Sequence, residues 1–429
     1  MNYSQTLEFL FSSMPSFQEK GHCAYKPGLE RVTAFCRHLG NPQRNYFTIH
    51  VAGTNGKGSV SHMLASILQQ AGYRTGLFTS PHLKDFRERI KVDGQMISRQ
   101  KVVNFVDKHH DKMVELGLSF FEMTASLAFD YFAQCDCEVV VIETGLGGRL
   151  DATNIILPSV SVVTNVGLEH TDLLGDTLEK IAAEKAGIIK KCIPVVLGEA
   201  NEAYNHVFEQ AAAANKSRVI YAEQTFRIEE HRHKGDKQYF EIARLRDGYK
   251  YCLSLDLIGD YQRHNVLTAC TVADYLHEET PLTISRRAFV DGISNVVGET
   301  SLCGRWQTLQ SEPRIICDTG HNAHGLRHVT QQLQKLEYNK LFCVLGFVKD
   351  KNIDEILPMF PKEAHYIFTQ AGIERAVDAS TLAAKAAEFG LQGEVVSEVP
   401  KALDRAKKLA ASGDVIFVGG STFVVAEVL

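Results

Sequence analysis

The chain has 429 residues, and its 46 Lys and Arg against 51 Asp and Glu give a formal net charge of −5. This length exceeds one ordinary hydrophobic core, so we expect two domains. The nearly balanced charge excludes a global attraction to nucleic acid or to an anionic membrane, and an anion has to bind locally.

The first residues and the cysteines predict a cytoplasmic protein. Met1–Gln5 contains neither a basic region nor a long apolar stretch, and no later run approaches the roughly 20 apolar residues of a membrane span. The cysteines form no CxxC pair, and Cys317 and Cys343 lie in apolar runs that suit reduced thiols. Cys135 and Cys137 alone are too few ligands for a metal site. The ten cysteines are Cys23, Cys36, Cys135, Cys137, Cys192, Cys252, Cys270, Cys303, Cys317 and Cys343.

Short β-rich runs alternate with helical patterns over the first half of the chain. This alternation is typical of a doubly wound α/β domain. The predicted strands are Thr48–Val51, Thr75–Phe78, Glu138–Ile142, Val160–Thr164, Pro194–Leu197 and Val219–Tyr221.

A glycine turn with one lysine joins the strand-like run Phe47–Val51 to a helix. Backbone N–H groups in such a turn converge on an anion at the positive end of the helix, where Lys57 can reach phosphates. Val51 stands where the strict P-loop pattern has its first glycine, and Gly58 follows the lysine, so the segment is a variant. A glycine-rich turn with a surface lysine is the alternative. The predicted phosphate-binding residues are Gly53, Thr54, Asn55, Gly56, Lys57, Gly58 and Ser59.

Polar side chains follow three of the predicted strands. In open α/β sheets ligands bind beyond the carboxyl ends of the strands, so Glu143 should face the phosphates and is a natural Mg²⁺ ligand. His170 follows another strand, although a hydrogen-bonded structural histidine is the alternative. Ser80 offers a hydroxyl at the same edge and would otherwise be a turn residue. Lys185 lies on a helix that starts near Thr177, where a lysine is normally a solvated surface cation.

The second half of the chain changes character twice. Residues Phe226–Leu255 predict a small antiparallel hairpin layer with a turn at Asp247-Gly248, and the charged run Glu229–Lys234 predicts a solvated loop, with a metal or anion site as the alternative. A helix resumes after Asn265, and Val296–Ser301 is the expected linker. A second, smaller α/β domain follows. Its predicted strands are Arg314–Cys317, Leu341–Leu345, Tyr366–Phe368, Glu394–Val396 and Val415–Gly419.

Five segments make a resemblance to a known family specific. They are Gly53–Ser59, Thr79–Leu83, Phe86–Ile90, Gly145–Asn154 and Glu184–Ile188. On these segments the chain resembles the bifunctional dihydrofolate synthase/folylpolyglutamate synthase family, a branch of the Mur ligase superfamily. The family has the same shortened ATP-binding loop. The resemblance implies a P-loop-type doubly wound ATPase domain in residues 1–297 and a smaller Rossmann-like α/β domain in residues 302–429.

The resemblance also implies roles for individual residues. Ser80, Glu143 and His170 would hold Mg²⁺, and Lys185 would be carbamylated, so that Lys57, Lys185 and His170 would be catalytic. Three further segments resemble nucleotide-binding segments of the family: Gly259–Asn265, Cys303–Gln307, where cysteine replaces a proline, and Asp318–Asn322. The ATP-binding residues implied in this way are Asn265, Arg305, Asp318 and His321. The implied pterin-binding residues are Phe121, Asp151 and Ala152, with Phe121 as a core residue being the alternative.

The implied activity is the ATP-dependent ligation of L-glutamate to dihydropteroate and to the γ-carboxylate of reduced folates through an acyl phosphate. Polyglutamylation alone and a Mur-type peptide ligase with another acceptor are the alternatives, and a nucleotide-binding regulatory protein is a rival from another class. The expected partners are ATP, Mg²⁺, a monovalent cation and small-molecule substrates, with no nucleic acid and no membrane. The chain is expected to be a monomer whose domains close about a hinge near Val296–Ser301.

Overall fold

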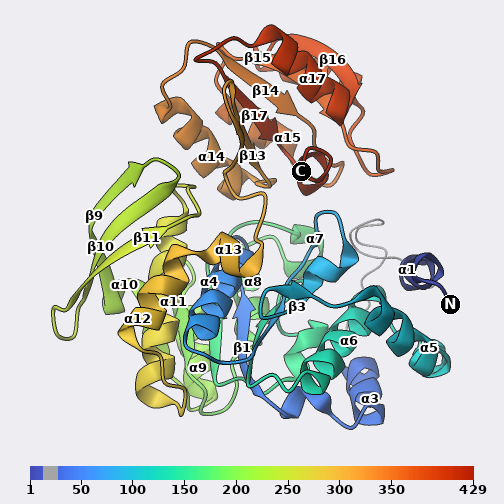
Figure 1. Cartoon of the computed structure of the whole chain (residues 1–429), viewed down its shortest axis with the longest axis vertical. Coiled ribbons are helices and arrows are strands. Elements are labelled where there is room, and N and C mark those ends of the chain that lie inside the picture. Colours follow the sequence, from blue (N-terminus) through green and yellow to red (C-terminus); the bar gives the residue numbers. More distant parts are fainter. Residues whose placement is uncertain (13–27) are drawn as a thin grey trace. The chain divides into compact units, whose positions relative to one another are not determined.

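The structure of the chain is a computed structural model that describes residues 1–12 and 28–429 (Figure 1). These residues divide into two compact units. Unit 1 comprises Met1–Asp256 and Gln262–Leu302, and unit 2 comprises Leu257–Tyr261 and Cys303–Leu429. The chain therefore passes between the units after Asp256, after Tyr261 and after Leu302.

Unit 1 is built on an eight-stranded sheet in the order β4-β3-β2-β5-β1-β6-β7-β8. The six predicted strands are confirmed and run parallel to one another. Two short strands, β3 and β4, were missed because they form an antiparallel edge too short to show an alternating pattern. The strands are β1 (Phe47–Ala52), β2 (Thr75–Phe78), β3 (Ile90–Val92), β4 (Gln95–Met96), β5 (Val139–Glu143), β6 (Val160–Val163), β7 (Val195–Leu197) and β8 (Val219–Tyr221).

Helices cover both faces of this sheet, as a doubly wound fold requires (Figure 1). Helix α4, which begins at Lys57, packs against β2 and β5 and is itself covered by α11 and α12. The other face carries a core of apolar side chains from α1, α3, α5 and α6. The helices are α1 (Tyr3–Ser12), α3 (Glu30–His38), α4 (Lys57–Gln70), α5 (Arg99–Leu116), α6 (Phe120–Gln134), α7 (Thr171–Leu174), α8 (Leu178–Ala186), α9 (Asn205–Ala214), α10 (Ala222–Thr225), α11 (Gln262–Glu279), α12 (Arg286–Ser294) and α13 (Val296–Thr300), with 3-10 turns η2 (Pro42–Arg44), η3 (Phe86–Arg89) and η4 (Ala152–Ile155).

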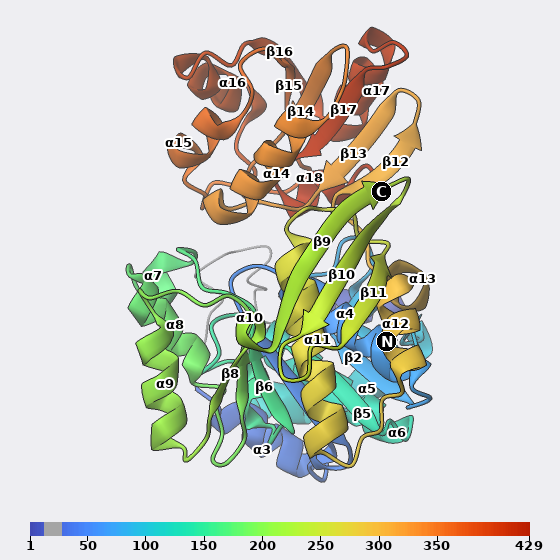
Figure 2. The same ribbon diagram turned by 90° about the vertical axis from the view of Figure 1, so that its left-hand side faces the viewer.

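A three-stranded antiparallel sheet of β9 (Phe226–Lys234), β10 (Lys237–Arg244) and β11 (Lys250–Leu255) packs against α11 and α12 (Figure 2). The predicted turn at Asp247-Gly248 is confirmed between β10 and β11. The prediction of a loop at Glu229–Lys234 was wrong, because this run forms most of β9. Strand β9 lies at the edge of the sheet and pairs only with β10 among the described strands, so its charged side chains remain largely in water.

The predicted linker Val296–Ser301 was also wrong. Residues Val296–Thr300 form helix α13 within unit 1, where Val296 and Thr300 are buried. After this helix the chain stays in unit 1 up to Leu302. Polar residues and a glycine suggested a linker, but the buried side chains at both ends of the segment hold it against α4.

Unit 2 contains a six-stranded sheet in the order β12-β13-β17-β14-β15-β16. The five strands predicted here are confirmed, whereas the antiparallel edge strand β12 was missed. The strands are β12 (Gln307–Ser311), β13 (Arg314–Asp318), β14 (Leu341–Leu345), β15 (His365–Gln370), β16 (Gly393–Glu398) and β17 (Val415–Gly419). The helices are α14 (Ala323–Lys335), α15 (Ile353–Ile356), η5 (Leu357–Met359), α16 (Ala379–Glu388), α17 (Val399–Leu409) and α18 (Thr422–Ala426).

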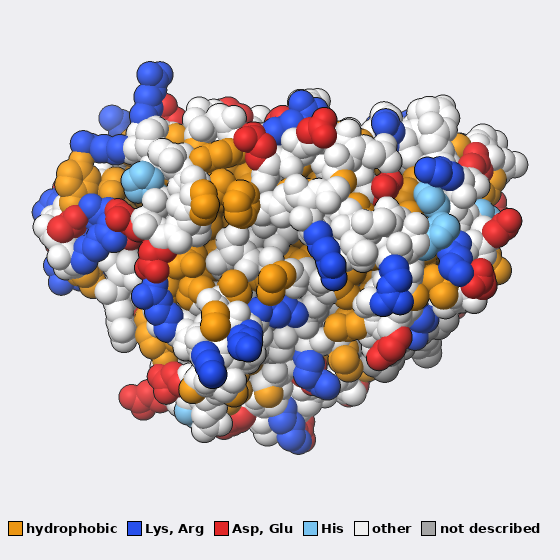
Figure 3. Space-filling view, turned by 90° about the horizontal axis from the view of Figure 1, so that it is seen from below, with side chains coloured by type: hydrophobic (Ala, Val, Ile, Leu, Met, Phe, Trp, Pro, Cys, Tyr) orange, Lys and Arg blue, Asp and Glu red, His pale blue; other side chains and the backbone are white. Residues whose placement is uncertain are grey.

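The cysteines and the surface agree with the sequence. Cys317 and Cys343 are buried free thiols, as predicted, and Cys23 lies outside the described residues. Figure 3 shows basic and acidic side chains interspersed over one face, without a large area of one sign. In the described part of the chain, no helix is both long and apolar enough to cross a membrane.

Candidate nucleotide and metal site

Two glycines shape the turn between β1 and α4. Gly53 and Gly56 have φ angles of +151° and +81°, which side-chain-bearing residues rarely adopt. A Cβ atom at Gly53 would overlap Thr164 Oγ1, and one at Gly56 would overlap Asn265 Oδ1. The turn is therefore closely covered by residues that lie more than one hundred positions away in the sequence.

Residues after β6 fix the backbone of this turn. Asn165 accepts hydrogen bonds from Thr54 N at its carbonyl (3.0 Å) and from Asn55 N at Oδ1 (2.9 Å). Thr164 Oγ1 donates to Asn55 O at 2.5 Å. Thr164 and Asn165 were not among the predicted site residues; their place at the carboxyl end of a predicted strand was the only sequence feature that could have indicated them.

Asn265 lies against the turn, where the resemblance placed it. Its Nδ2 donates to Gln262 Oε1 (2.8 Å), and Gln262 Nε2 donates to Ser59 Oγ (3.2 Å). All three side chains are buried. The first turn of α11 therefore supports the first turn of α4, while a contact between Asn265 and ATP stays a prediction.

Lys57 folds over the turn. Its Nζ donates to Gly53 O at 2.9 Å and to Thr54 O at 3.1 Å. The ammonium group thus lies at the N-terminus of α4, where unpaired backbone N–H groups and the helix dipole favour an anion. This geometry suits a phosphate group, which would accept hydrogen bonds from both the lysine and the backbone.

Ser80 and Glu143 meet at the carboxyl edge of the sheet. Glu143 ends β5 and is 2% exposed, and Ser80 N lies 3.4 Å from its Oε2. Since β5 pairs with β1, this carboxylate lies at the same edge as the phosphate turn. A carboxylate and a hydroxyl are oxygen donors of the kind that Mg²⁺ binds, so this pair fits the ion.

His170 lies at the same edge, on the loop after β6. Its backbone is left-handed (φ 51°), it precedes α7, and its Nε2 lies 3.9 Å from Glu169 Oε1. Over residues 1–12 and 28–429, no three His, Cys, Asp or Glu side chains gather in an arrangement that could hold a metal ion. The structure thus brings Ser80 and Glu143 together, and metal binding by His170 stays a prediction.

Arg89, which is buried, and His82, which is half-buried, lie near this edge and were not assigned a role from the sequence. Arg89 Nε donates to His82 Nδ1 at 2.8 Å, and its guanidinium carbon lies 5.2 Å from the centre of the Phe120 ring. Burial lowers the pKa of Arg89 to about 10, against the attraction of Glu143. Burial also lowers the pKa of His82 to about 3, so His82 is neutral and Arg89 is charged at neutral pH.

Lys185 is not the solvated cation that its helical position predicts. The side chain is 3% exposed. Burial lowers the pKa of Lys185 to about 7, the positive charge of Lys57 acts in the same direction, and Glu169 opposes both. A large fraction of the Lys185 amine is therefore neutral at physiological pH, which makes it a nucleophile.

The segments expected to bind the pterin also pack together. The Phe121 ring is half-buried over Gly145, where a Cβ would collide with it, and lies 5.8 Å from the Phe78 ring. Asp151 is buried and accepts hydrogen bonds from Gly145 N (2.8 Å) and Leu146 N (2.9 Å) at Oδ2. Its other oxygen accepts from the backbone of the η4 turn, which contains the buried Ala152. Asp151 thus folds its own loop, and its pairing with a pterin stays a prediction.

The predicted nucleotide residues of unit 2 form a cluster of their own. Asp318 accepts hydrogen bonds from Trp306 N and from the Tyr261 hydroxyl, both at 2.7 Å. Arg305 Nη1 donates to Gly304 O (3.3 Å) and to the hydroxyl of Thr319, and His321 Nδ1 lies 2.9 Å from Thr319 O. Arg305, Asp318 and His321 are therefore brought together, and Tyr261 is a half-buried member of the cluster that was not among the predicted residues.

Known protein families match both units. Residues 51–273 match the model of the Mur ligase middle domain, and residues 304–422 match that of the Mur ligase glutamate ligase domain. The chain therefore has the domain composition of a Mur ligase.

Individual relatives show to which family of Mur ligases the chain belongs. The chain is 32% identical over 427 residues to the dihydrofolate synthase/folylpolyglutamate synthase of Bacillus subtilis, with 94% of each chain covered. It is also 32% identical over 441 residues to a probable bifunctional folylpolyglutamate synthase/dihydropteroate synthase of Haloferax volcanii, and it spans half the length of that relative. The chain belongs to the dihydrofolate synthase/folylpolyglutamate synthase family.

Solved structures agree with this membership. The structure of Escherichia coli FolC in complex with DHPP and ADP has a TM-score of 0.86 and 30% identity, with 100% of this chain and 97% of that chain covered. The bifunctional folylpolyglutamate synthase/dihydrofolate synthase of Yersinia pestis, complexed with AMPPNP and a Mn ion, has a TM-score of 0.83 and 28% identity, with 100% and 97% covered. The predicted fold, an α/β nucleotide-binding domain followed by a smaller α/β domain, is confirmed.

Proposed function

We propose that this chain uses ATP to ligate L-glutamate to dihydropteroate, forming dihydrofolate, and to the γ-carboxylate of reduced folates, forming folylpolyglutamates. The observation that carries the proposal is the shared sheet edge of the phosphate turn, Ser80 and Glu143, which follow three adjacent strands. The choice of dihydropteroate and folates as acceptors is supported by the names of the homologous ligases described above.

The reaction needs an activated carboxylate, because a carboxylate oxygen is a poor leaving group for an attacking amine. An oxygen of the acceptor carboxylate attacks the γ-phosphorus of ATP and releases ADP. The α-amine of glutamate then attacks the acyl carbon and releases phosphate, with loss of one proton from the amine. Lys57 is proposed to stabilise the charge on the transferred phosphoryl group, and Arg305 is proposed to bind the phosphates of the nucleotide.

Mg²⁺ would be held by Glu143 and Ser80, with His170 as the third proposed ligand, and would neutralise phosphate charge. Arg89 holds positive charge near Glu143 and attracts that carboxylate. Asn265, Asp318 and His321 are proposed to bind ATP, and Phe121, Asp151 and Ala152 to bind the pterin.

Lys185 is proposed to carry a carbamate. Its neutral amine attacks carbon dioxide: an N–C bond forms, one C–O π bond breaks with its electron pair going to oxygen, and the nitrogen loses one proton, so that the neutral amine becomes an anionic carbamate. Such an anion would orient a metal ion or water near the γ-phosphate. Further predictions are a monovalent cation at the site, a cytoplasmic location and a monomeric state.

Phosphate release from Mg-ATP and glutamate, measured with dihydropteroate or tetrahydrofolate as the acceptor and with products identified by mass, tests the proposal. Glutamate addition to both acceptors is expected. Addition to tetrahydrofolate alone would restrict the activity to polyglutamylation. Turnover with neither would overturn the proposal in favour of a Mur-type ligase with another acceptor, and ATP hydrolysis that ignores glutamate would favour a regulatory protein.

A further inference from the structure

Helix α13 connects two of the places where the chain leaves unit 1. Asp256 is the last residue before the first crossing into unit 2, and Leu302 is the last before the third. Asp256 Oδ1 accepts a hydrogen bond from Val296 N (3.1 Å), and its Oδ2 accepts one from Val297 N (2.8 Å). The first crossing therefore caps the N-terminus of α13, whose C-terminus leads into the third crossing two residues later.

Lys91 holds the other end of α13. Its Nζ donates to Thr300 O at 2.7 Å and to Ser301 O at 3.3 Å, two carbonyls at the end of the helix. The Lys91 side chain is 4% exposed although it carries an ammonium group, so water screens these bonds little. The turn after β3 adds a close contact, since a Cβ at Gly94 would overlap Glu299 O.

His62 makes a second attachment at the same end. Its Nδ1 lies 2.7 Å from Thr300 Oγ1, and both side chains are buried. Thr300 Oγ1 donates its own proton to Val296 O at 2.5 Å. His62 Nδ1 is therefore the donor to the threonine hydroxyl.

Both anchors sit on elements of the candidate site. Lys91 lies on β3, two residues after Arg89, and His62 lies on α4, five residues after Lys57. In the described residues, the C-terminal end of α13 is thus held by His62 on α4 and by Lys91 on β3. Its N-terminal end is held by Asp256, at the first crossing into unit 2.

We propose that Lys91 and His62 are positioning residues that couple nucleotide binding at the phosphate turn to the two chain crossings at Asp256 and Leu302, through helix α13. They do not touch the substrates. Their part is to set where the chain leaves unit 1 when Lys57 and the first turn of α4 bind phosphate. This inference rests on the proposed function, because it assumes that the phosphate turn binds ATP. Its first test requires no dihydropteroate or folate.

Amide hydrogen exchange of residues 296–302, with and without Mg²⁺ and a non-hydrolysable ATP analogue, is the first test. We expect the analogue to slow exchange there by at least about threefold in the unaltered protein. Lys91→Met keeps the size of the side chain and removes the donor. It should abolish the slowing while binding the analogue with less than about a twofold change in Kd. Lys112→Met, which alters a partly exposed lysine on α5 paired with Glu115, is the matched control and should behave like the unaltered protein.

Thr300→Val gives an independent variant if Lys91→Met does not fold, because it removes only the hydroxyl that His62 contacts. It should reduce the slowing as well. An analogue that binds the unaltered protein without slowing exchange at 296–302, or slowing that persists in every folded variant, would overturn the inference.

A second readout separates this inference from the proposed function. In Lys91→Met, phosphate released per glutamate ligated should rise above one, because a loosened helix α13 holds the chain crossings less firmly and leaves the acyl phosphate open to water. If the unaltered protein ligates glutamate and the variants keep a ratio of one, the coupling is wrong and the ligase activity stands. If the unaltered protein does not ligate, the proposed function fails and the exchange result still decides the coupling.

Discussion

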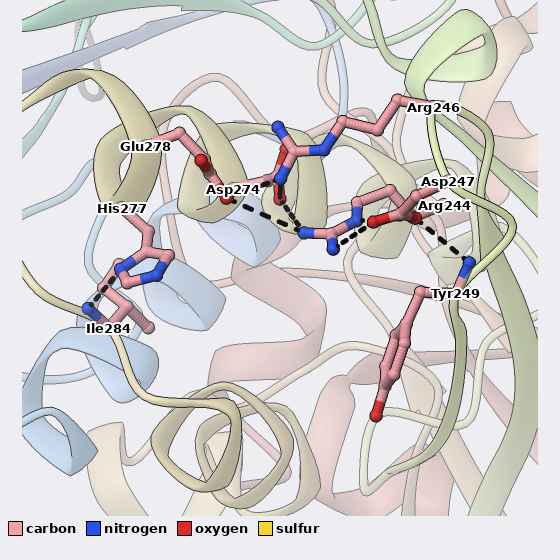
Figure 4. Close-up of polar contacts among 8 residues, drawn as sticks. All are labelled: Arg244, Arg246, Asp247, Tyr249, Asp274, His277, Glu278 and Ile284. Carbon is pink, nitrogen blue, oxygen red and sulfur yellow. Dashed lines mark hydrogen bonds and ion pairs between the residues drawn. The ribbon is translucent and has the colours of Figure 1, made fainter.

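Two polar clusters of unit 1 differ in their exposure to solvent. One lies at the carboxyl edge of the eight-stranded sheet and contains Glu143, Arg89 and Lys185, each less than 4% exposed. The other joins the turn between β10 and β11 to α11 (Figure 4). There Arg244 bonds Asp274 (2.8 Å) and Asp247 (2.5 Å), and Arg246 bonds Asp274 and Glu278, with Arg246 and Glu278 more than 40% exposed.

Similar interactions have different consequences in the two clusters. At the sheet edge, burial lowers the pKa of Lys185 to about 7 and that of His82 to about 3. Both groups therefore hold a proton less readily than the same side chains in water. In the exposed cluster, the hydrogen bond from Arg244 lowers the pKa of Asp247, which is ionised at neutral pH in any case. The density of ion pairs alone therefore does not identify the site.

Glu143→Gln is expected to have the largest effect. The amide keeps the shape of the side chain but loses the charge that would bind Mg²⁺, and we expect kcat/KM for ligation to fall by at least about 1,000-fold. Steady-state kinetics over a range of Mg²⁺ concentrations measures this, with circular dichroism as the control for folding. Activity close to that of the unaltered protein would remove Glu143 from the site.

Lys57→Met comes next. The variant loses the ammonium group at the N-terminus of α4 and keeps the backbone N–H groups, so we expect a fall of about 100-fold in kcat/KM for ATP. Lys180→Met is a matched control, because Lys180 is an exposed lysine paired with Asp176. Equal losses in the two variants would contradict a specific role for Lys57.

Lys185 gives a pH-dependent prediction for the unmodified protein. Its folded pKa of about 7 lies below the value of 10.5 for a free lysine, so between these values the unfolded chain binds more protons than the folded one. The free energy of unfolding should therefore rise from pH 7 toward pH 10 relative to Lys185→Met, and the difference should be flat below pH 7. Urea denaturation at several pH values, in buffers freed of carbon dioxide, measures it. A difference that does not change with pH would show that the Lys185 amine is not buried.

Arg246→Gln should have the smallest effect. Its ion pairs with Asp274 and Glu278 are screened by water, so we expect a loss of less than about 1 kcal/mol in the free energy of unfolding and no change in kcat. Urea denaturation in low and high salt measures the loss, which should shrink with salt. A loss of activity would show that the sheet of β9–β11 takes part in the reaction. The exposed cluster would then not differ in function from the buried one.

The sequence predicted the parallel strands and the phosphate turn, because a buried strand, a glycine turn and an amphipathic helix are all local patterns. It missed β3, β4 and β12, which are short antiparallel edges, and it placed Glu229–Lys234 in a loop although edge strands tolerate charge. These errors concern segments whose conformation is decided by a neighbouring strand rather than by their own residues.

The site was predictable in part. Their places after predicted strands indicated Glu143 and Ser80, the resemblance indicated Asn265, and the structure places them at the expected edge or against the turn. The burial of Lys185 could not be read from helical spacing, and the resemblance implied only that this lysine is carbamylated. Contacts such as Asn165 with Asn55 join residues 110 positions apart, which no local pattern reveals.

The central claim is that a carboxylate is phosphorylated and then displaced by glutamate. An acceptor labelled with oxygen-18 in its carboxylate, incubated with ATP, Mg²⁺ and glutamate, tests this most directly by mass spectrometry of the released phosphate. The account predicts one labelled oxygen in each phosphate, since the oxygen that attacks ATP leaves with the phosphoryl group. Ligation that releases only unlabelled phosphate would contradict it.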